Sequence, residues 1–254
     1  MGPINVPVML EGENLHDLQT HNLWLIQKEH GFRFGMDAVL LSDFCRTNKN
    51  ARIADFGTGT GIISVLLVGK GKASSVDAFE ILPDMADMAK RNVEMNAQTE
   101  KIRIWNMDCG AAARVIEQNS LDAVVTNPPY GENGRTLINP DPVKAMARHQ
   151  NTDTLCHFFK SAYTCLKGKG KLFLIYPVQG MLSIMDELKK YHLEPKRFRL
   201  IYPYTDKPAN LVLIEAVKDA KPGLLSMPPL VIYRTQGVYT DEVYEIYSIS
   251  TQTD

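Results

Sequence analysis

The 254-residue sequence has few cysteines and no long apolar run, and both absences exclude classes of protein. No stretch of about 18 apolar residues occurs, so we expect no membrane span. The first ten residues carry no basic segment and include Pro3 and Pro7, which argues against a secretory signal. We therefore expect a cytoplasmic protein with reduced thiols and no metal site. Its four cysteines lie far apart and form no CxxC pair: Cys45, Cys109, Cys156 and Cys165.

A strong positive charge is also missing. The formal net charge is −1 at pH 7, whereas proteins that bind nucleic acid often carry a positive balance, because phosphate contacts supply much of the affinity. A nucleic-acid partner would therefore have to bind a local patch. Three basic clusters are candidates, at residues 167–171, 189–190 and 196–199, and the solvated face of an ordinary enzyme explains each one equally well.

Short apolar segments alternate with amphipathic helical stretches from residue 51 onward. This order is typical of βα units that build a parallel sheet. We expect helices at Ile62–Val68, Pro83–Asn96 and Ser183–Tyr191. The expected strands lie at residues 51–56, 74–79, 101–106, 121–126, 171–176, 197–202 and 210–217.

The last two expected strands are joined by a connection, Pro203–Ala209, that is too short for a parallel crossover. They should therefore pair antiparallel, at one end of a mostly parallel sheet with helices on both faces. We divide the chain into an N-terminal extension, residues 1–50, with its own helix near Asp37–Cys45, a core of residues 51–218, and a surface tail of residues 219–254.

A glycine-rich turn separates the first core strand from its helix. It contains Asp55, Gly57, Thr58, Gly59 and Gly61. Glycines allow a tight turn and let a ligand approach the backbone closely. The spacing is G-x-G-x-G, whereas the dinucleotide fingerprint is G-x-G-x-x-G, and no lysine stands beside the turn to take a phosphate.

Acidic residues follow the next two expected strands. Glu80 ends one of them, nineteen residues after Gly61, where a carboxylate can accept both ribose hydroxyls of a nucleoside. Asp108 follows the other, where it could accept from an adenine amino group or simply cap the next helix. Together with the turn, these residues resemble the S-adenosylmethionine site of the class I methyltransferases, whose Rossmann-like α/β fold has a seven-stranded sheet.

The fourth expected strand runs into the loop Asn127-Pro128-Pro129-Tyr130. Loops at the carboxyl ends of such strands lie beside the ligand cleft. The side-chain oxygen of Asn127 and the carbonyl of Pro128 can accept the two hydrogens of a planar amino group and favour a nucleophilic, pyramidal nitrogen. The prolines stiffen the loop, and Tyr130 offers a ring on which an extruded base can stack.

Over about residues 15–245 the chain resembles the bacterial methyltransferase family that modifies adenine N6 at position 37 of a valine tRNA. The similarity rests on the glycine turn, the Asn-Pro-Pro-Tyr loop, Gly31–Leu41 and Ala147-Arg148-His149. It implies S-adenosylmethionine as cofactor and tRNA as substrate, with a monomer or weak homodimer expected. Asn127, Pro128 and Tyr130 would be catalytic, and Asn127 would also face the cofactor.

The same resemblance implies further contacts. The N-terminal extension would pack on the cofactor site, where Phe34, Gly35 and Asp37 would contact the methionine end of the cofactor. Asp37 could equally be a helix N-cap. Pro129, Tyr130, Arg148 and His149 would contact the substrate, although a structural role for His149 is equally possible.

Other functional classes remain open at this stage. A protein-glutamine N5-methyltransferase uses the same loop on an amide nitrogen, but usually carries a longer, helical N-terminal domain than about 50 residues can form. A DNA adenine methyltransferase usually needs an added recognition domain, and an rRNA substrate is a further alternative. A binding module without activity would be expected to lose some of the glycine turn, Glu80 and Asn127.

Overall fold

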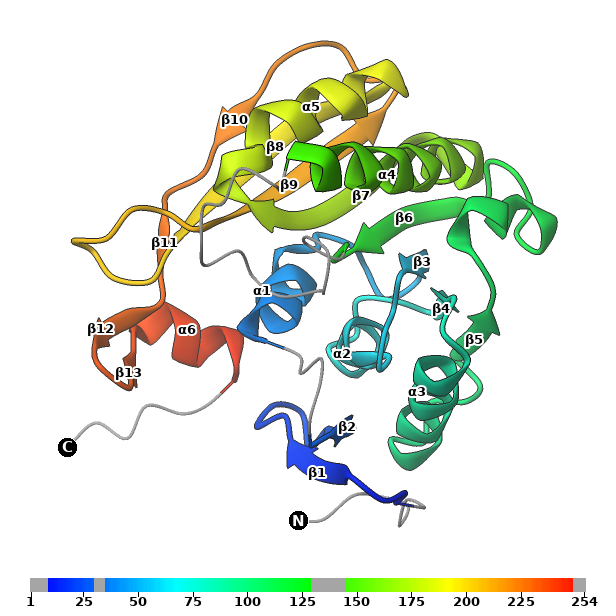
Figure 1. The fold of residues 1–254 in the computed structure, drawn as a ribbon, viewed down its shortest axis with the longest axis vertical. Helices are drawn as coiled ribbons and strands as arrows, with labels where there is room; N and C mark the ends of the chain where they lie inside the picture. The colour runs from blue at the N-terminus through cyan, green and yellow to red at the C-terminus, as the bar shows by residue number, and fades with distance from the viewer. Residues whose placement is uncertain (1–8, 30–34, 129–144, 249–254) are drawn as a thin grey trace.

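The computed structural model describes residues 9–29, 35–128 and 145–248, and of residues 145–154 only the backbone. Within them a nine-stranded mixed sheet forms the centre of the molecule (Figure 1). Its strands run in the order β10-β8-β9-β7-β6-β3-β4-β5, and β11 also pairs with β8. The seven long strands are β3 (Arg52–Phe56), β4 (Ser75–Glu80), β5 (Ile102–Asn106), β6 (Leu121–Thr126), β7 (Leu166–Pro177), β8 (Leu193–Tyr202) and β9 (Leu211–Lys218).

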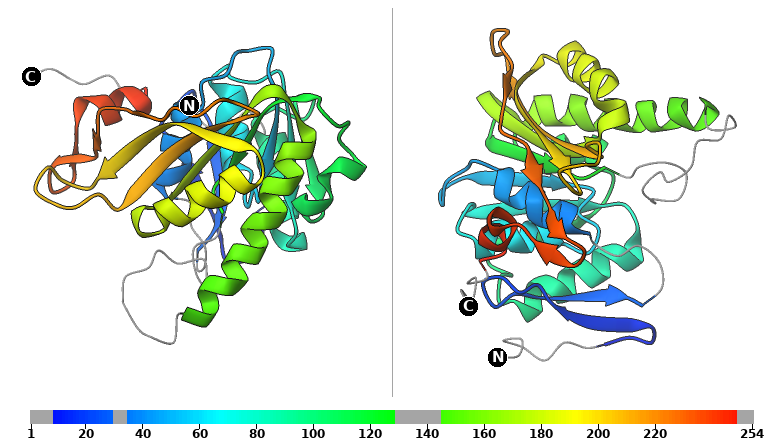
Figure 2. Two further views of the ribbon diagram at one scale, coloured as in Figure 1. Left: turned by 90° about the horizontal axis from the view of Figure 1, so that it is seen from above. Right: turned by 90° about the vertical axis from the view of Figure 1, so that its left-hand side faces the viewer.

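Helices cover both faces of the sheet (Figure 2). Successive side chains of a strand enter different cores, as with Ile53 on one face of the sheet and Ala54 on the other. One core includes α1 (Met36–Phe44), α2 (Ile62–Gly69) and part of α3 (Pro83–Met95). The opposite core includes α4 (Ala145–Cys165), α5 (Met181–Lys190) and a 3-10 turn at Cys109–Arg114.

The predicted class of fold is confirmed. Strands β3 to β7 are parallel neighbours, and β9 pairs antiparallel with both β7 and β8, as the short Pro203–Ala209 connection required. Two of the strands begin earlier than predicted, at Leu166 and Leu193. The sequence analysis also missed the long helix α4, although Leu155, Phe158, Phe159 and Ala162 have helical spacing.

An N-terminal hairpin was not predicted. Its strands β1 (Glu13–Asp17) and β2 (Trp24–Lys28) pair antiparallel beside α3. The buried Asn92 side chain fixes this contact, because it accepts from the Ile26 N–H at 2.6 Å and donates to the Ile26 carbonyl at 3.1 Å. Arg91 adds an ion pair with Glu13 at 2.6 Å. The hairpin is thus tied to the helix that follows β4.

The C-terminal residues are part of the fold. Short strands β10 (Leu225–Ser226) and β11 (Leu230–Val231) extend the sheet, and a hairpin, β12 (Tyr233–Thr235) and β13 (Val238–Tyr239), leads to α6 (Asp241–Ile246). The division of the chain at residues 50 and 218 stays a prediction.

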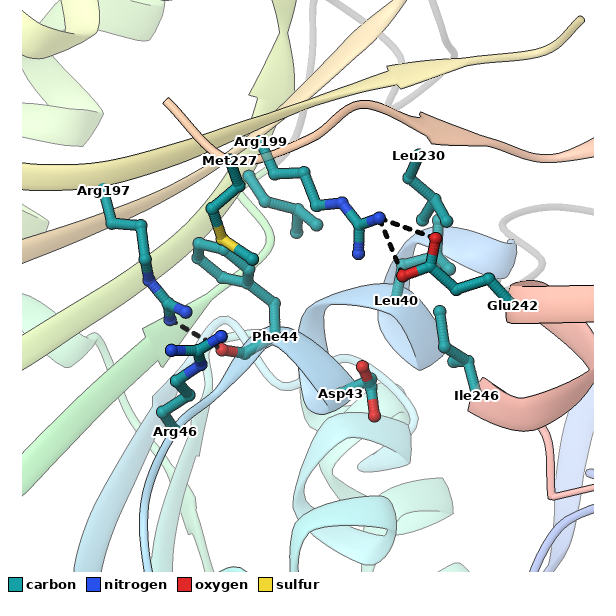
Figure 3. A pocket seen from close by; sticks show the side chains of 11 residues that line it. Leu40, Asp43, Phe44, Arg46, Arg197, Arg199, Met227, Leu230, Glu242 and Ile246 are labelled. Atoms are coloured by element: carbon teal, nitrogen blue, oxygen red, sulfur yellow. Dashed lines mark hydrogen bonds and ion pairs between the residues drawn. The ribbon is translucent and has the colours of Figure 1, made fainter. Parts of the chain in front are cut away.

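Two arginines of β8 border a recess of about 220 Å³ between α1, β8 and α6 (Figure 3). Arg199 donates to the Pro228 carbonyl at 2.9 Å and pairs with Glu242 at 2.7 Å. Arg197 lies over the Phe44 ring and pairs with Glu215 at 2.6 Å. The contacts of Arg199 fix the C-terminal segment to β8, and those of Arg197 join β8 to α1 and β9.

Candidate active site

The loops after β3, β4 and β6 leave the sheet at one edge and at one level. In the register of the sheet, Phe56 pairs with Phe79 on one side and with Thr126 on the other. Asn106, at the end of β5, pairs with Glu80. Ligands of open α/β sheets bind at this carboxyl edge. The structure therefore brings together the glycine turn, Glu80 and Asn127, as predicted from the sequence.

The glycine turn is held by the neighbouring strand. The N–H groups of Gly57 and Thr58 both donate to the Phe79 carbonyl, at 3.0 and 2.9 Å. Gly61 is the N-cap of α2 at φ 83°, and a Cβ there would lie 3.3 Å from Ala89 of α3, so glycine also permits close helix packing. Among the described residues, a Cβ at Gly59, φ 58°, would meet only the tip of Met85, at 3.9 Å. The space above Gly59 therefore fits a ligand that approaches the backbone.

Asp55 supports the turn from below. It is fully buried and accepts hydrogen bonds from the Thr58 hydroxyl at 2.6 Å and from the Ser64 hydroxyl at 2.8 Å. Burial raises the pKa of this carboxyl to about 6. The side chains of Asp55 and Thr58 thus bond to each other, which gives both a role in positioning the turn. Their direct contact with a cofactor stays a prediction.

The raised pKa of Asp55 predicts a pH-dependent stability. The folded carboxyl keeps its proton up to about pH 6, whereas the unfolded one releases it near pH 3.8, so the folded state binds more protons between these values. Stability from this group is therefore fully present below about pH 4 and falls as pH rises towards 6. As pH rises from 4.5 to 7, we expect the unfolding free energy of the wild type to fall by at least about 1 kcal/mol relative to that of Asp55→Asn.

Denaturant unfolding of both proteins across that range measures the difference, in which the other titrating groups cancel. If the stability difference between the wild type and Asp55→Asn stayed constant with pH, it would contradict the raised pKa of Asp55.

Glu80 lies at the end of β4 with 8% of its surface exposed. One carboxylate oxygen accepts from the Gly59 N–H and the other from the Leu82 N–H, both at 2.9 Å. Its backbone carbonyl accepts from the Asn106 side chain at 2.9 Å. Because a carboxylate has about four acceptor positions, each oxygen can still accept a ribose hydroxyl. The residues present therefore fit a bound nucleoside.

Asp108 and Asp37 lie at the starts of short-range elements, a 3-10 turn and helix α1. Asp108 is exposed and its side chain accepts from the Gly110 N–H at 2.8 Å, so the capping role left open above is observed. Asp37 is not an N-cap: Gly35 holds that position, and Asp37 lies in the first turn of α1, where burial raises its pKa. Contacts of Gly35, Asp37 and Asp108 with a cofactor stay predictions. Phe34 lies outside the described residues.

The predicted catalytic loop, residues 127–130, follows a strand end that is held in place. The Thr126 hydroxyl donates to the Phe56 carbonyl at 2.9 Å, which joins the end of β6 to the end of β3. Asn127 is half-buried and Pro128 is buried. Pro129 and Tyr130 lie outside the described residues. Arg148 and His149 belong to the first turns of α4, and their side chains lie outside the described part of the chain.

Three packed phenylalanine rings lie beneath the glycine turn, and they were not predicted from the sequence. Phe158 of α4 packs edge-to-face on Phe56, with ring centroids 6.3 Å apart, and Phe56 packs in the same way on Phe79 at 5.5 Å. A Cβ at Gly57 would touch Phe158 at 3.8 Å. Helix α4 therefore supports the turn from the opposite side to α2. The helical spacing of its apolar residues was the available signal.

Residues 35–194 match the family model described as the methyltransferase small domain. The chain belongs to this family. This methyltransferase is 30% identical over 192 residues to a protein of Parabacteroides distasonis named tRNA1(Val) (adenine(37)-N6)-methyltransferase. The aligned residues cover 75% of this chain and 79% of the relative. The family resemblance stated from the sequence is thereby confirmed.

Solved structures agree with the fold of this methyltransferase. A predicted O-methyltransferase from Agrobacterium tumefaciens superimposes with a TM-score of 0.67 and 21% identity, covering 84% of this chain and 96% of that one. TYW2 from M. jannaschii, solved in complex with AdoMet, gives a TM-score of 0.55 at 14% identity, covering 84% and 89%.

In the described part of the chain, no group of three or more His, Cys, Asp and Glu side chains is arranged to hold a metal ion. No described helix is both long and apolar enough to cross a membrane.

Proposed function

We propose that this enzyme transfers the methyl group of S-adenosylmethionine to N6 of an adenine in tRNA, at position 37 of a valine tRNA. The observation that carries the proposal is the convergence of the glycine turn, Glu80 and Asn127 at one sheet edge. The name of the relative from Parabacteroides distasonis supports the choice of substrate. We further propose a cytoplasmic enzyme that works as a monomer or weak homodimer.

Each part of the site has one task in this proposal. S-adenosylmethionine supplies an electrophilic methyl group on a sulfonium. The glycine turn lets the nucleoside approach the backbone near Gly59, and Glu80 accepts its ribose hydroxyls. Asn127 and the Pro128 carbonyl accept the two hydrogens of the adenine amino group and direct its lone pair towards the methyl group. No general base is required, because the proton can leave the methylated nitrogen afterwards.

A protein glutamine is the alternative substrate, because an amide nitrogen presents the same two hydrogens to the same loop. Residues 13–28 form a short hairpin that packs on α3 through Asn92. They do not build the helical domain that we associated with protein-glutamine methyltransferases. The name of the relative from Parabacteroides distasonis favours the tRNA proposal.

Salt dependence separates the two substrates. If tRNA binds, its apparent affinity should fall steeply as salt rises, roughly a thousandfold from 50 to 200 mM for six or more phosphate contacts, because counterions are released from the phosphates. The measurement is the KM for unfractionated tRNA at several salt concentrations, with labelled S-adenosylmethionine as methyl donor. Glutamine-bearing protein is the control substrate, and its methylation should vary less. Label in protein and none in tRNA would contradict the proposal.

A further inference from the structure

Four tyrosines of the C-terminal region form a continuous row of rings. Tyr204 packs on Tyr233 with ring centroids 5.5 Å apart, and Tyr233 stacks on Tyr239 at 5.3 Å. Tyr239 then stacks on Tyr247 at 5.8 Å, with the planes only 10° apart. All four side chains are partly exposed. We call these residues the tyrosine row.

The tyrosine row lies at the same sheet edge as the candidate active site. Strand β8 runs antiparallel to β9, which is antiparallel to β7, so β8 ends at the edge where β6 releases Asn127. Tyr204 follows β8 directly. Strand β11 pairs parallel with the last residues of β8, which carries the β12–β13 hairpin beyond that edge (Figure 1).

The row also adjoins the N-terminal extension. Met36 of α1 packs on the same core cluster as Tyr239 and Tyr247. Burial raises the pKa of the Tyr247 hydroxyl, and the nearby Asp37 of α1 adds to this effect. The inner end of the row therefore lies near Asp37, in the first turn of the helix that was predicted to face the cofactor. Arg199 holds the C-terminal segment in place, because it donates to the Pro228 carbonyl and pairs with Glu242 (Figure 3).

Tyr204 is the outer ring of the row. Among the described residues its ring contacts Tyr233, and it lies in the exposed connection between β8 and β9. Two exposed ion pairs lie in the adjoining segments: Lys207 with Asp206 at 3.7 Å, in the same connection as Tyr204, and Arg234 with Asp241, next to Tyr233 in the sequence. Exposed pairs contribute little to stability, so Lys207 and Arg234 can exchange these carboxylates for phosphates at low cost.

We infer that the tyrosine row is an RNA-binding surface, on which Tyr204 stacks an unpaired base of the tRNA substrate while Lys207 and Arg234 contact its phosphates. Aromatic stacking is the usual way in which proteins hold unstacked RNA bases. It also suits a chain with a net charge of −1, because stacking does not need a large basic surface. This inference rests on the proposed function, since it assigns the row to the same substrate.

The test compares Tyr204→Ala and Tyr204→Phe in the full-length enzyme. We expect the alanine variant to raise the KM for tRNA about five- to tenfold, at the lower end of the effect of one lost stacking contact, while kcat at saturating tRNA and the cofactor Kd stay unchanged. The phenylalanine variant should behave like the wild type, because it keeps the ring. Tyr191→Ala is the matched control, since Tyr191 is a partly exposed tyrosine that precedes β8 at the opposite sheet edge.

An unchanged KM for Tyr204→Ala, or an equal increase for Tyr191→Ala, would overturn the inference and leave the proposed function intact. Direct binding of a labelled anticodon stem-loop RNA separates the two ideas further. If the wild type methylated no tRNA but bound this RNA more tightly than Tyr204→Ala did, the stacking surface would stand and the proposed reaction would fall.

Discussion

Asn127→Ala is expected to lower kcat by roughly two to three decades, because removing one well-placed polar group that stabilises the transition state has an effect of this size. Affinity for S-adenosylmethionine should change little, since the side-chain oxygen of Asn127 acts chiefly on the reacting amino group. Single-turnover methylation of tRNA gives the chemical step, and calorimetry gives the cofactor Kd.

Asn48→Ala is the matched control for this variant. Asn48 lies in the exposed connection between α1 and β3, where its side chain accepts from the Asn50 N–H at 2.9 Å. It should keep the wild-type rate. A wild-type kcat in Asn127→Ala would show that the loop after β6 does not catalyse the reaction. An equal loss of rate and cofactor affinity would instead place Asn127 in cofactor binding.

Glu80→Ala is expected to weaken binding of S-adenosylmethionine by at least tenfold and up to about a hundredfold. Hydrogen bonds to a charged group contribute roughly 1.5–3 kcal/mol each, and about 1.4 kcal/mol corresponds to one decade in Kd. The variant also removes the acceptor for the Gly59 N–H, so the glycine turn loses a contact at 2.9 Å. Both effects act in the same direction.

Calorimetry with S-adenosylmethionine measures the loss. Glu80→Gln tests the charge while it keeps the shape of the side chain. Its amide group places an NH2 donor where one carboxylate oxygen accepts, so only one of the Gly59 and Leu82 N–H groups keeps its acceptor. We expect this variant to fall between the wild type and the alanine variant. Glu117→Ala, an exposed glutamate before β6, is the control for charge. Unchanged affinity in Glu80→Ala would remove Glu80 from the cofactor site.

Local patterns were sufficient to predict that the glycine turn, Glu80 and Asn127 lie at one edge of the sheet. The glycine turn, Glu80 and Asn127 each follow an apolar strand directly, and parallel strands bring their carboxyl ends to one edge whatever the details of packing. The same reasoning left Asp108 open between two roles, because an acidic residue after a strand can bind a ligand or cap the next turn. The structure shows the cap, with Gly110 as its donor.

Contacts between distant segments could not be predicted in this way. The hairpin of residues 13–28 depends on Asn92, which lies 66 positions after Ile26 in the sequence. Strands β10 and β11 have two residues each and pair only because β8 offers a free edge. The tyrosine row brings Tyr204 together with three tyrosines of the tail, residues 219–254. No local pattern connects these residues, so the tail was predicted to lie on the surface.

The position of the transferred methyl group in the tRNA decides whether the enzyme has the proposed function. Purified enzyme is incubated with S-adenosylmethionine and an unmodified valine tRNA transcript, and the digested RNA is analysed by mass spectrometry. We predict N6-methyladenosine at position 37 and no product from a transcript that carries guanine at that position. Methylation of another nucleotide, or equal methylation of both transcripts, would contradict the proposed function.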